Sequence, residues 1–145
     1  MENRNFDYIS KINFITSEID GLYHQASLKL GLNDSTARVL YTLMVHTGSC
    51  LLSDIYKQSG IGKQTVNSAL RKLEEDGIVC LEQVDGRSKK VNLTDKGNRY
   101  ADDTISKLIA AEAKACEQWS EGEISQYLDL SRKFLHTLRE EVNKL

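Results

Sequence analysis

The most informative side chains in this sequence are a group of polar residues with no acid among them. They are Lys63, Gln64, Thr65, Asn67, Ser68 and Arg71, and three acids follow only at positions 74–76. Helical spacing sets them opposite an apolar face of Val66, Ala69, Leu70 and Leu73. Gln and Asn can bond adenine bidentately, Arg can bond guanine, and a Thr methyl can pack on thymine. The face therefore suits the major groove of DNA, although a polar helix face is also typical of an ordinary solvated surface.

A basic hairpin follows this helix along the chain. The sequence predicts strands at 78–83 and 90–93, joined by a turn with an Asp-Gly pair that is favoured in hairpins. Arg87, Lys89 and Lys90 lie at or just past the tip, where an arginine fits a narrow A·T-rich minor groove and lysines fit phosphates. We expect Asp85 to hold the Arg87 guanidinium by a bidentate ion pair, although an exposed turn pair can be worth little.

The elements around these residues form a helix-turn-helix. A short helix at about 53–58, in which Ile55 and Tyr56 are predicted to point inward, is followed by a glycine turn at 59–62 and the helix at 63–76. Ser53 joins the candidate DNA contacts. Apolar spacing predicts longer helices at 6–30, from 33 to about 46, from 94 to about 119, and from 120 onward. Their predicted N-terminal caps are Asn33, Thr94 and a capping box of Ser120 and Glu123.

Charge and hydropathy exclude several classes of protein. The net charge is −2, but residues 51–99 hold nine basic and seven acidic side chains, so the positive excess lies in the middle of the chain. No run approaches the 20 or so apolar residues of a membrane span, and the N-terminal residues lack the apolar core of a signal peptide. We expect a cytoplasmic protein that has no membrane partner.

Cysteine and histidine patterns give no sign of a cofactor. Cys50, Cys80 and Cys116 are interpreted as small core residues in a reducing compartment, with a redox-reactive thiol as the alternative. The three histidines form no ligand pair, so neither a metal nor another cofactor is expected. The sequence contains none of the common catalytic signatures, and we expect the protein not to be an enzyme.

The hairpin sequence resembles a family signature. The run from Asp85 to Gly97, DGRSKKVNLTDKG, is similar to the wing of the MarR family of winged helix-turn-helix regulators, and Leu73–Val79 is similar to the end of its recognition helix. Gly62 departs from the Ser or Thr that often caps that helix in the family, and glycine also caps acceptably. The resemblance implies a mostly α (α+β) fold with a winged helix-turn-helix at 33–97 and a helical dimerisation region at 1–32 and 98–145.

The resemblance also implies a homodimer that binds palindromic double-stranded DNA, as a repressor released by a ligand or an oxidant. Long apolar stripes at both ends of the chain favour a dimer independently, although terminal helices could instead cover each other within a monomer. The family often binds small anionic or phenolic effectors in a cleft between the dimer helices and the winged unit. The candidate effector contacts by that analogy are Tyr23, His24, Arg38 and Tyr41.

Two alternatives remain open at this point. The same fold could serve as a protein-interaction module that has no affinity for DNA. A thiol- or metal-dependent sensor or enzyme is the other alternative. Salt-dependent binding to duplex DNA would separate the first from a DNA-binding regulator, because phosphate neutralisation gives a steep salt slope.

Overall fold

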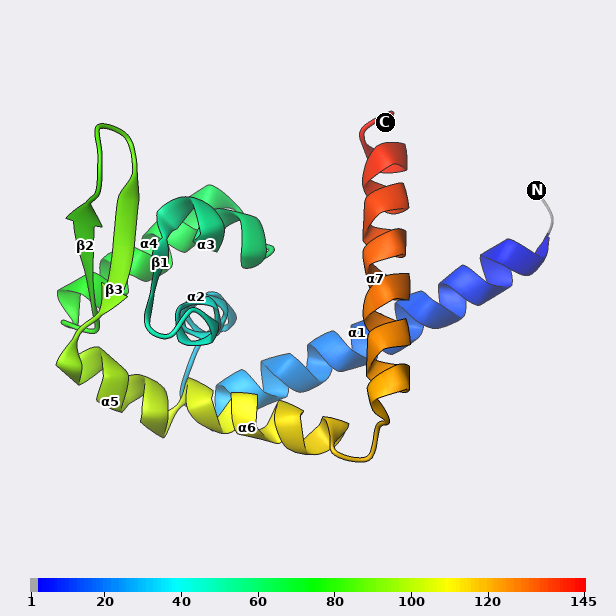
Figure 1. Ribbon diagram of the computed structural model, residues 1–145, viewed down its shortest axis with the longest axis horizontal. Coiled ribbons are helices and arrows are strands. Elements are labelled where there is room, and N and C mark those ends of the chain that lie inside the picture. Colours follow the sequence, from blue (N-terminus) through cyan, green and yellow to red (C-terminus); the bar gives the residue numbers. More distant parts are fainter. Residues whose placement is uncertain (1–2) are drawn as a thin grey trace. The chain divides into compact units, whose positions relative to one another are not determined.

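The computed structural model describes the backbone from Asn3 to Leu145 and the side chains from Arg4 onward. The chain divides into two compact units, one up to Ile109 and one from Ala110 to Leu145. The elements are α1 (Asn3–Lys29), α2 (Asp34–Val45), β1 (Ser49–Leu51), α3 (Leu52–Gln58), α4 (Lys63–Glu75), β2 (Val79–Gln83), β3 (Lys89–Leu93), α5 (Asp95–Asp103), α6 (Ile105–Cys116) and α7 (Glu121–Val142) (Figure 1).

The helix ends confirm the predicted caps. The Asn33 side chain accepts a hydrogen bond from the Thr36 amide at 2.8 Å, and the Thr94 hydroxyl accepts one from the Gly97 amide at 2.9 Å. Ser120 and Glu123 form both hydrogen bonds of a capping box. These bonds satisfy amide groups that the first turn of a helix leaves unpaired.

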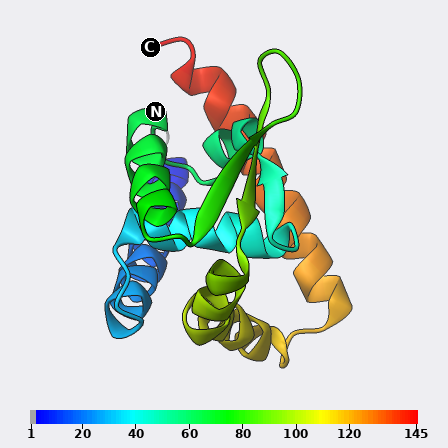
Figure 2. The same ribbon diagram turned by 90° about the vertical axis from the view of Figure 1, so that its left-hand side faces the viewer.

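The first unit contains a three-stranded antiparallel sheet in the order β1-β3-β2. The β2–β3 hairpin, called the wing below, pairs Val79 with Leu93 at its base and Gln83 with Lys89 near its tip. Both ribbon views show the loop of the wing extending past the rest of the sheet (Figure 1 and Figure 2). Strand β1 was not predicted, because three residues are too few for a period-two pattern. It exists through pairing with β3, with Cys50 opposite Val91.

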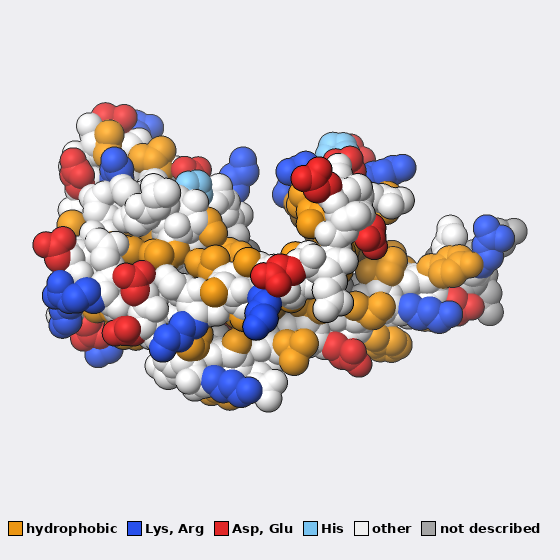
Figure 3. All heavy atoms as spheres, turned by 60° about the horizontal axis from the view of Figure 1, so that its bottom comes forward, with side chains coloured by type: hydrophobic (Ala, Val, Ile, Leu, Met, Phe, Trp, Pro, Cys, Tyr) orange, Lys and Arg blue, Asp and Glu red, His pale blue; other side chains and the backbone are white. Residues whose placement is uncertain are grey.

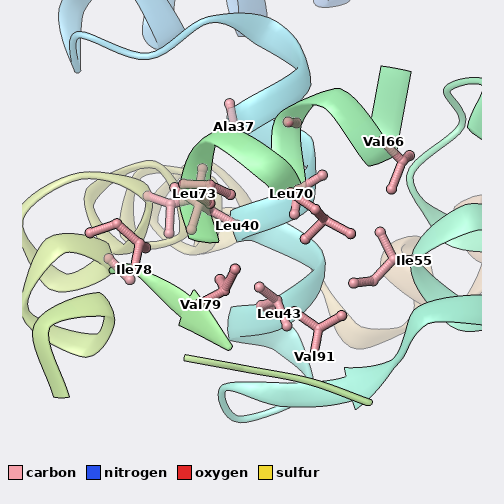
Figure 4. Close-up of a cluster of buried hydrophobic side chains, with 14 of the residues drawn as sticks. Ala37, Leu40, Leu43, Ile55, Val66, Leu70, Leu73, Ile78, Val79 and Val91 are labelled. Atoms are coloured by element: carbon pink, nitrogen blue, oxygen red, sulfur yellow. The ribbon is translucent and has the colours of Figure 1, made fainter. Parts of the chain in front are cut away.

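One hydrophobic core holds the sheet and the helices of the first unit together. Leu40 and Leu43 of α2, Ile55 of α3, Val66 of α4 and Val91 of β3 are all fully buried. Figure 4 shows these side chains converging from the four elements. Because α4 contributes its apolar face to this core, its opposite face must point to solvent.

The expected single helix from 94 to 119 is wrong. The chain breaks at Thr104, whose φ and ψ are −123° and −91°, so that α5 and α6 are separate helices. The Thr104 hydroxyl donates to the Tyr100 carbonyl at 2.7 Å, a bond that bends helices. The break lets Ala101 and Ile105 both reach full burial in the core.

The interpretation of all three cysteines as core residues holds for one of them. Cys50 is buried, whereas Cys80 and Cys116 are exposed. Burial, together with the nearby Asp54 carboxylate, raises the pKa of the Cys50 thiol to about 11. Cys80 is exposed because alternate residues of β2 face opposite sides of the sheet, with Val79 inside.

Two helices expose large apolar side chains. In α1, Phe6, Phe14 and Leu22 are each more than 60% exposed. In α7, of which every residue is described, none of the 22 residues is buried, although Phe134 and Leu135 lie among them. Figure 3 shows hydrophobic side chains at the surface over α1. None of the described helices has the length and apolarity needed to cross a membrane.

Candidate nucleic-acid interface

Helix α4 presents its polar face to solvent as the sequence predicts. Four residues of the helix are buried in the core, namely Val66, Ala69, Leu70 and Leu73. The exposed residues include all six polar candidates, Lys63, Gln64, Thr65, Asn67, Ser68 and Arg71. Gly62 begins the helix without a side-chain cap, so the first amides of α4 remain available to an anion.

Tyr56 of α3 contacts two of these candidates. Its hydroxyl donates to Asn67 Oδ1 at 2.5 Å, and the Lys63 ammonium lies 5.4 Å from the centre of its ring. A cation at that distance is attracted by the aromatic face. Sequence reasoning treated Tyr56 as an inward residue, and it is indeed half-buried. Its second role was missed, because the contact joins residues of two different helices.

The tip of the wing is organised by Asp85. Its carboxylate accepts hydrogen bonds from the backbone amides of Arg87 at 3.2 Å and Ser88 at 3.0 Å. These bonds hold the pKa of Asp85 below its usual range. The expected bidentate ion pair with the Arg87 guanidinium is therefore wrong: the carboxylate shapes the backbone of the turn and leaves the Arg87 side chain exposed.

Helices α3 and α4 and the wing enclose an open cavity of about 400 Å³. Three cations, Lys63, Arg87 and Lys89, contribute to its wall. The other lining residues are Leu52, Ser53, Tyr56 and Ser88, and no acid is among them. The structure thus brings Ser53, Lys63, Arg87 and Lys89 to one place, although they come from three separate segments. Such a concentration of positive charge in a concave site favours an anionic partner.

The remaining candidates lie outside this cavity. Gln64, Thr65, Ser68 and Arg71 continue along the exposed side of α4. Lys90 is half-buried on β3, opposite Glu82 of β2 and Leu51 of β1. We call the six polar residues of α4, the cavity lining and the wing tip together the interface.

The base of the wing is fixed by the Leu-Thr-x-x-Gly segment. The Thr94 hydroxyl donates to the Gly77 carbonyl at 2.6 Å while its backbone amide donates to the Ile78 carbonyl at 3.0 Å. A Cβ added at Gly97 would overlap the Ile78 carbonyl oxygen. Only glycine lets α5 approach β2 this closely, so this segment sets the position of the wing relative to α4.

The four effector candidates have structural contacts of their own. His24 of α1 lies 2.8 Å from the Asp34 carboxylate of α2, and Arg38 donates to the Ser59 carbonyl at 3.2 Å. Tyr23 is partly exposed on α1, and Tyr41 packs against the core. An effector role for these residues stays a prediction. Among the described residues, no cluster of His, Cys, Asp and Glu is arranged to hold a metal ion.

A helix-turn-helix followed by a two-stranded wing defines a winged helix-turn-helix protein. A sequence model described as MarR family matches residues 30–88 of this chain. This match covers the winged-helix segment, and over most of its length the chain has the fold of solved MarR family regulators. No curated protein matches the sequence.

Solved structures share this fold at low sequence identity. NMB1585, a MarR family regulator from Neisseria meningitidis, aligns with a TM-score of 0.84 at 17% identity over 94% of this chain and 97% of its own. MepR of S. aureus, solved in complex with DNA, aligns with a TM-score of 0.66 at 24% identity over 90% and 97%. The organohalide-sensing regulator RdhR-CbdbA1625 aligns with a TM-score of 0.63 at 14% identity over 95% and 83%.

Proposed function

We propose that this protein is a transcriptional regulator that binds double-stranded DNA through the interface. The observation that carries the proposal is the cationic cavity, because it joins the start of α4 to the wing and none of its lining residues is an acid. A recognition helix enters the major groove by its N-terminal residues, where the positive end of the helix dipole also lies. The resemblance to the MepR–DNA complex supports this placement.

The residues divide by the part of the duplex that each would contact. Lys63, Lys89 and Ser53 lie around the cavity and bind phosphate oxygens, which fixes register. Arg87 extends from the wing tip into the minor groove, with Lys90 on a neighbouring phosphate. The base edges are contacted by Gln64, Thr65, Asn67, Ser68 and Arg71.

The protein acts as a homodimer in this proposal. The apolar side chains of α1 and α7 are too many and too exposed for a stable monomer surface, since exposed patches of this kind mark interaction sites. The winged helix-turn-helix at 33–97 then contacts DNA, and the helices at 1–32 and 98–145 join two copies. Twofold symmetry directs the two recognition helices to a palindrome with half-sites one helical turn apart.

Regulation would follow from the coupling between dimer helices and winged units. We propose repression that an effector relieves by favouring a dimer geometry in which the two recognition helices no longer match successive grooves. The relative that senses organohalides supports the existence of a small-molecule effector. His24 and Arg38 are candidate contacts because they join α1 to α2 and α2 to the turn before α4.

The test is selection of duplexes from a random pool by the purified full-length protein, followed by sequencing. The expected product is an inverted repeat whose half-site centres are about 10 base pairs apart. A protein that stays folded and dimeric but retains no sequence contradicts the proposal and favours an interaction module. Repeating the selection with candidate effectors identifies any ligand that releases the DNA.

A further inference from the structure

The hydrogen bond between Tyr56 and Asn67 restricts which bases Asn67 can recognise. We infer that Tyr56 is a positioning residue that turns the Asn67 oxygen away from the groove, so that Asn67 acts there as a hydrogen-bond donor and favours a keto base, guanine or thymine. The inference rests on the proposed function, because it takes α4 to lie in the major groove. In this orientation Asn67 does not make the bidentate contact with adenine that its residue type alone suggests.

The hydrogen bond from Tyr56 sets the orientation of the Asn67 amide. The Tyr56 hydroxyl donates to Asn67 Oδ1 at 2.5 Å, which directs this oxygen toward α3 and away from the groove. A bidentate contact with adenine needs the oxygen and the nitrogen of the amide side by side, the first accepting from N6 and the second donating to N7. Because Oδ1 is turned toward Tyr56, the exposed side of the Asn67 amide carries the two Nδ2 hydrogens, even though the oxygen keeps a second lone pair.

The major groove separates bases by what they present to such a donor. Guanine offers the acceptors O6 and N7, and thymine offers the acceptor O4. Adenine offers the single acceptor N7 beside a donating amino group, and cytosine offers only an amino donor. An Asn67 that presents its N–H groups to the groove therefore rejects cytosine, contacts adenine through N7 alone, and favours guanine or thymine, which have no amino group beside the acceptor.

Tyr56 can impose this restriction because it is itself fixed. The ring is half-buried beside Ile55, which is wholly buried in the core, and its other neighbours include the Lys63 ammonium at 5.4 Å. The ring lines the cavity, so the hydroxyl reaches Asn67 from inside the interface. Ordering of this kind holds the amide before DNA arrives and lowers the entropy that binding must overcome.

The experiment compares sequence preferences of the wild type, Tyr56→Phe and Asn67→Ala in the same random pool. Tyr56→Phe keeps the ring and its contact with Lys63 but removes the hydroxyl, which frees Asn67 Oδ1. We expect adenine to rise about fivefold or more relative to guanine and thymine at one base pair of each half-site. Tyr100→Phe, which removes a tyrosine hydroxyl from α5 outside the interface, should leave the preferred sequence unchanged.

Two further variants separate positioning from folding. Asn67→Asp can still accept the Tyr56 hydroxyl but has no N–H to donate, so it should lose the keto preference at the same base pair. Adding Tyr56→Phe to Asn67→Ala should cause no further change in preference, because Tyr56 acts through Asn67. The midpoint of urea unfolding for Tyr56→Phe should stay close to that of the wild type, since the ring packing is kept.

The outcomes distinguish this inference from the proposed function. A wild type that selects a defined operator, with a Tyr56→Phe variant that selects the identical one, overturns the inference and leaves the proposed function standing. A wild-type preference for adenine at the base pair that responds to Asn67→Ala overturns it equally. A wild type that selects no sequence overturns both.

Discussion

Substitution of Gly97 by alanine tests the packing that positions the wing. The added Cβ would overlap the Ile78 carbonyl oxygen, lie 2.9 Å from its carbon, and lie 3.2 Å from Leu93 Cδ2. Two of these three atoms are backbone, so the start of α5 must move away from β2. Overpacking costs about 1–3 kcal/mol, and strain on the Thr94 cap adds about 1 kcal/mol. The better helix propensity of alanine returns about 1 kcal/mol, which leaves a net loss of about 1–3 kcal/mol.

The assay is urea unfolding at a fixed protein concentration, with Gly122→Ala as the matched control. Gly122 also lies in the first turn of a helix, but the nearest atom to an added Cβ is Ser120 Oγ at 3.8 Å. Gly97→Ala should unfold at a clearly lower urea concentration, and Gly122→Ala should be unchanged or slightly more stable. Equal midpoints for the two variants would refute the close approach of α5 to β2.

Four other predictions concern the wing tip, the cysteines and the surface of α7. Asp85→Ala should weaken DNA binding by loosening the wing tip, whereas Asp85→Asn keeps an acceptor for the amides of Arg87 and Ser88 and should bind at least as well; equal losses measured by fluorescence anisotropy would contradict the role of the carboxylate. A thiol reagent at pH 8 should modify Cys80 and Cys116 but not Cys50 in the folded protein. The folded state keeps the Cys50 proton up to about pH 11, whereas the ordinary thiol pKa is 9.0. The free energy of unfolding should therefore fall as the pH rises from 9 to 11, and Cys50→Ala should remove that part of the fall. Leu135→Asp on α7 should shift sedimentation toward the monomer, and a sedimentation coefficient equal to that of the wild type would exclude this face from the dimer.

Much of the fold could be predicted because its signals are local. The apolar spacing of α4, the caps at Asn33 and Thr94, and the capping box at Ser120 each depend on residues within one or two turns. The polar face of α4 followed from the same spacing, because burying Val66 and Leu70 forces the opposite side outward.

The features that were missed depend on contacts between distant segments. Strand β1 forms because Cys50 finds Val91 on β3, about 40 residues later, and its own sequence carries no strand pattern. The helix breaks at Thr104 because Ile105 is buried in the core, and helix propensity alone does not predict that burial. Tyr56 looked like a core residue because only the fold shows that its hydroxyl reaches Asn67. The Asp85 carboxylate accepts hydrogen bonds from the backbone amides of Arg87 and Ser88 and does not pair with the Arg87 guanidinium, because the turn places these amides close to it.

In the proposed complex, the cations around the cavity and on α4 neutralise the phosphates of one duplex. The most direct measurement is the salt dependence of binding to a selected operator, as the slope of log K against log salt concentration. Lys63→Gln and Lys89→Gln should each reduce the slope by about one, while Lys107→Gln on α6 should leave it unchanged. A wild type whose binding does not depend on salt, or slopes that are the same for all three variants, would contradict the claim.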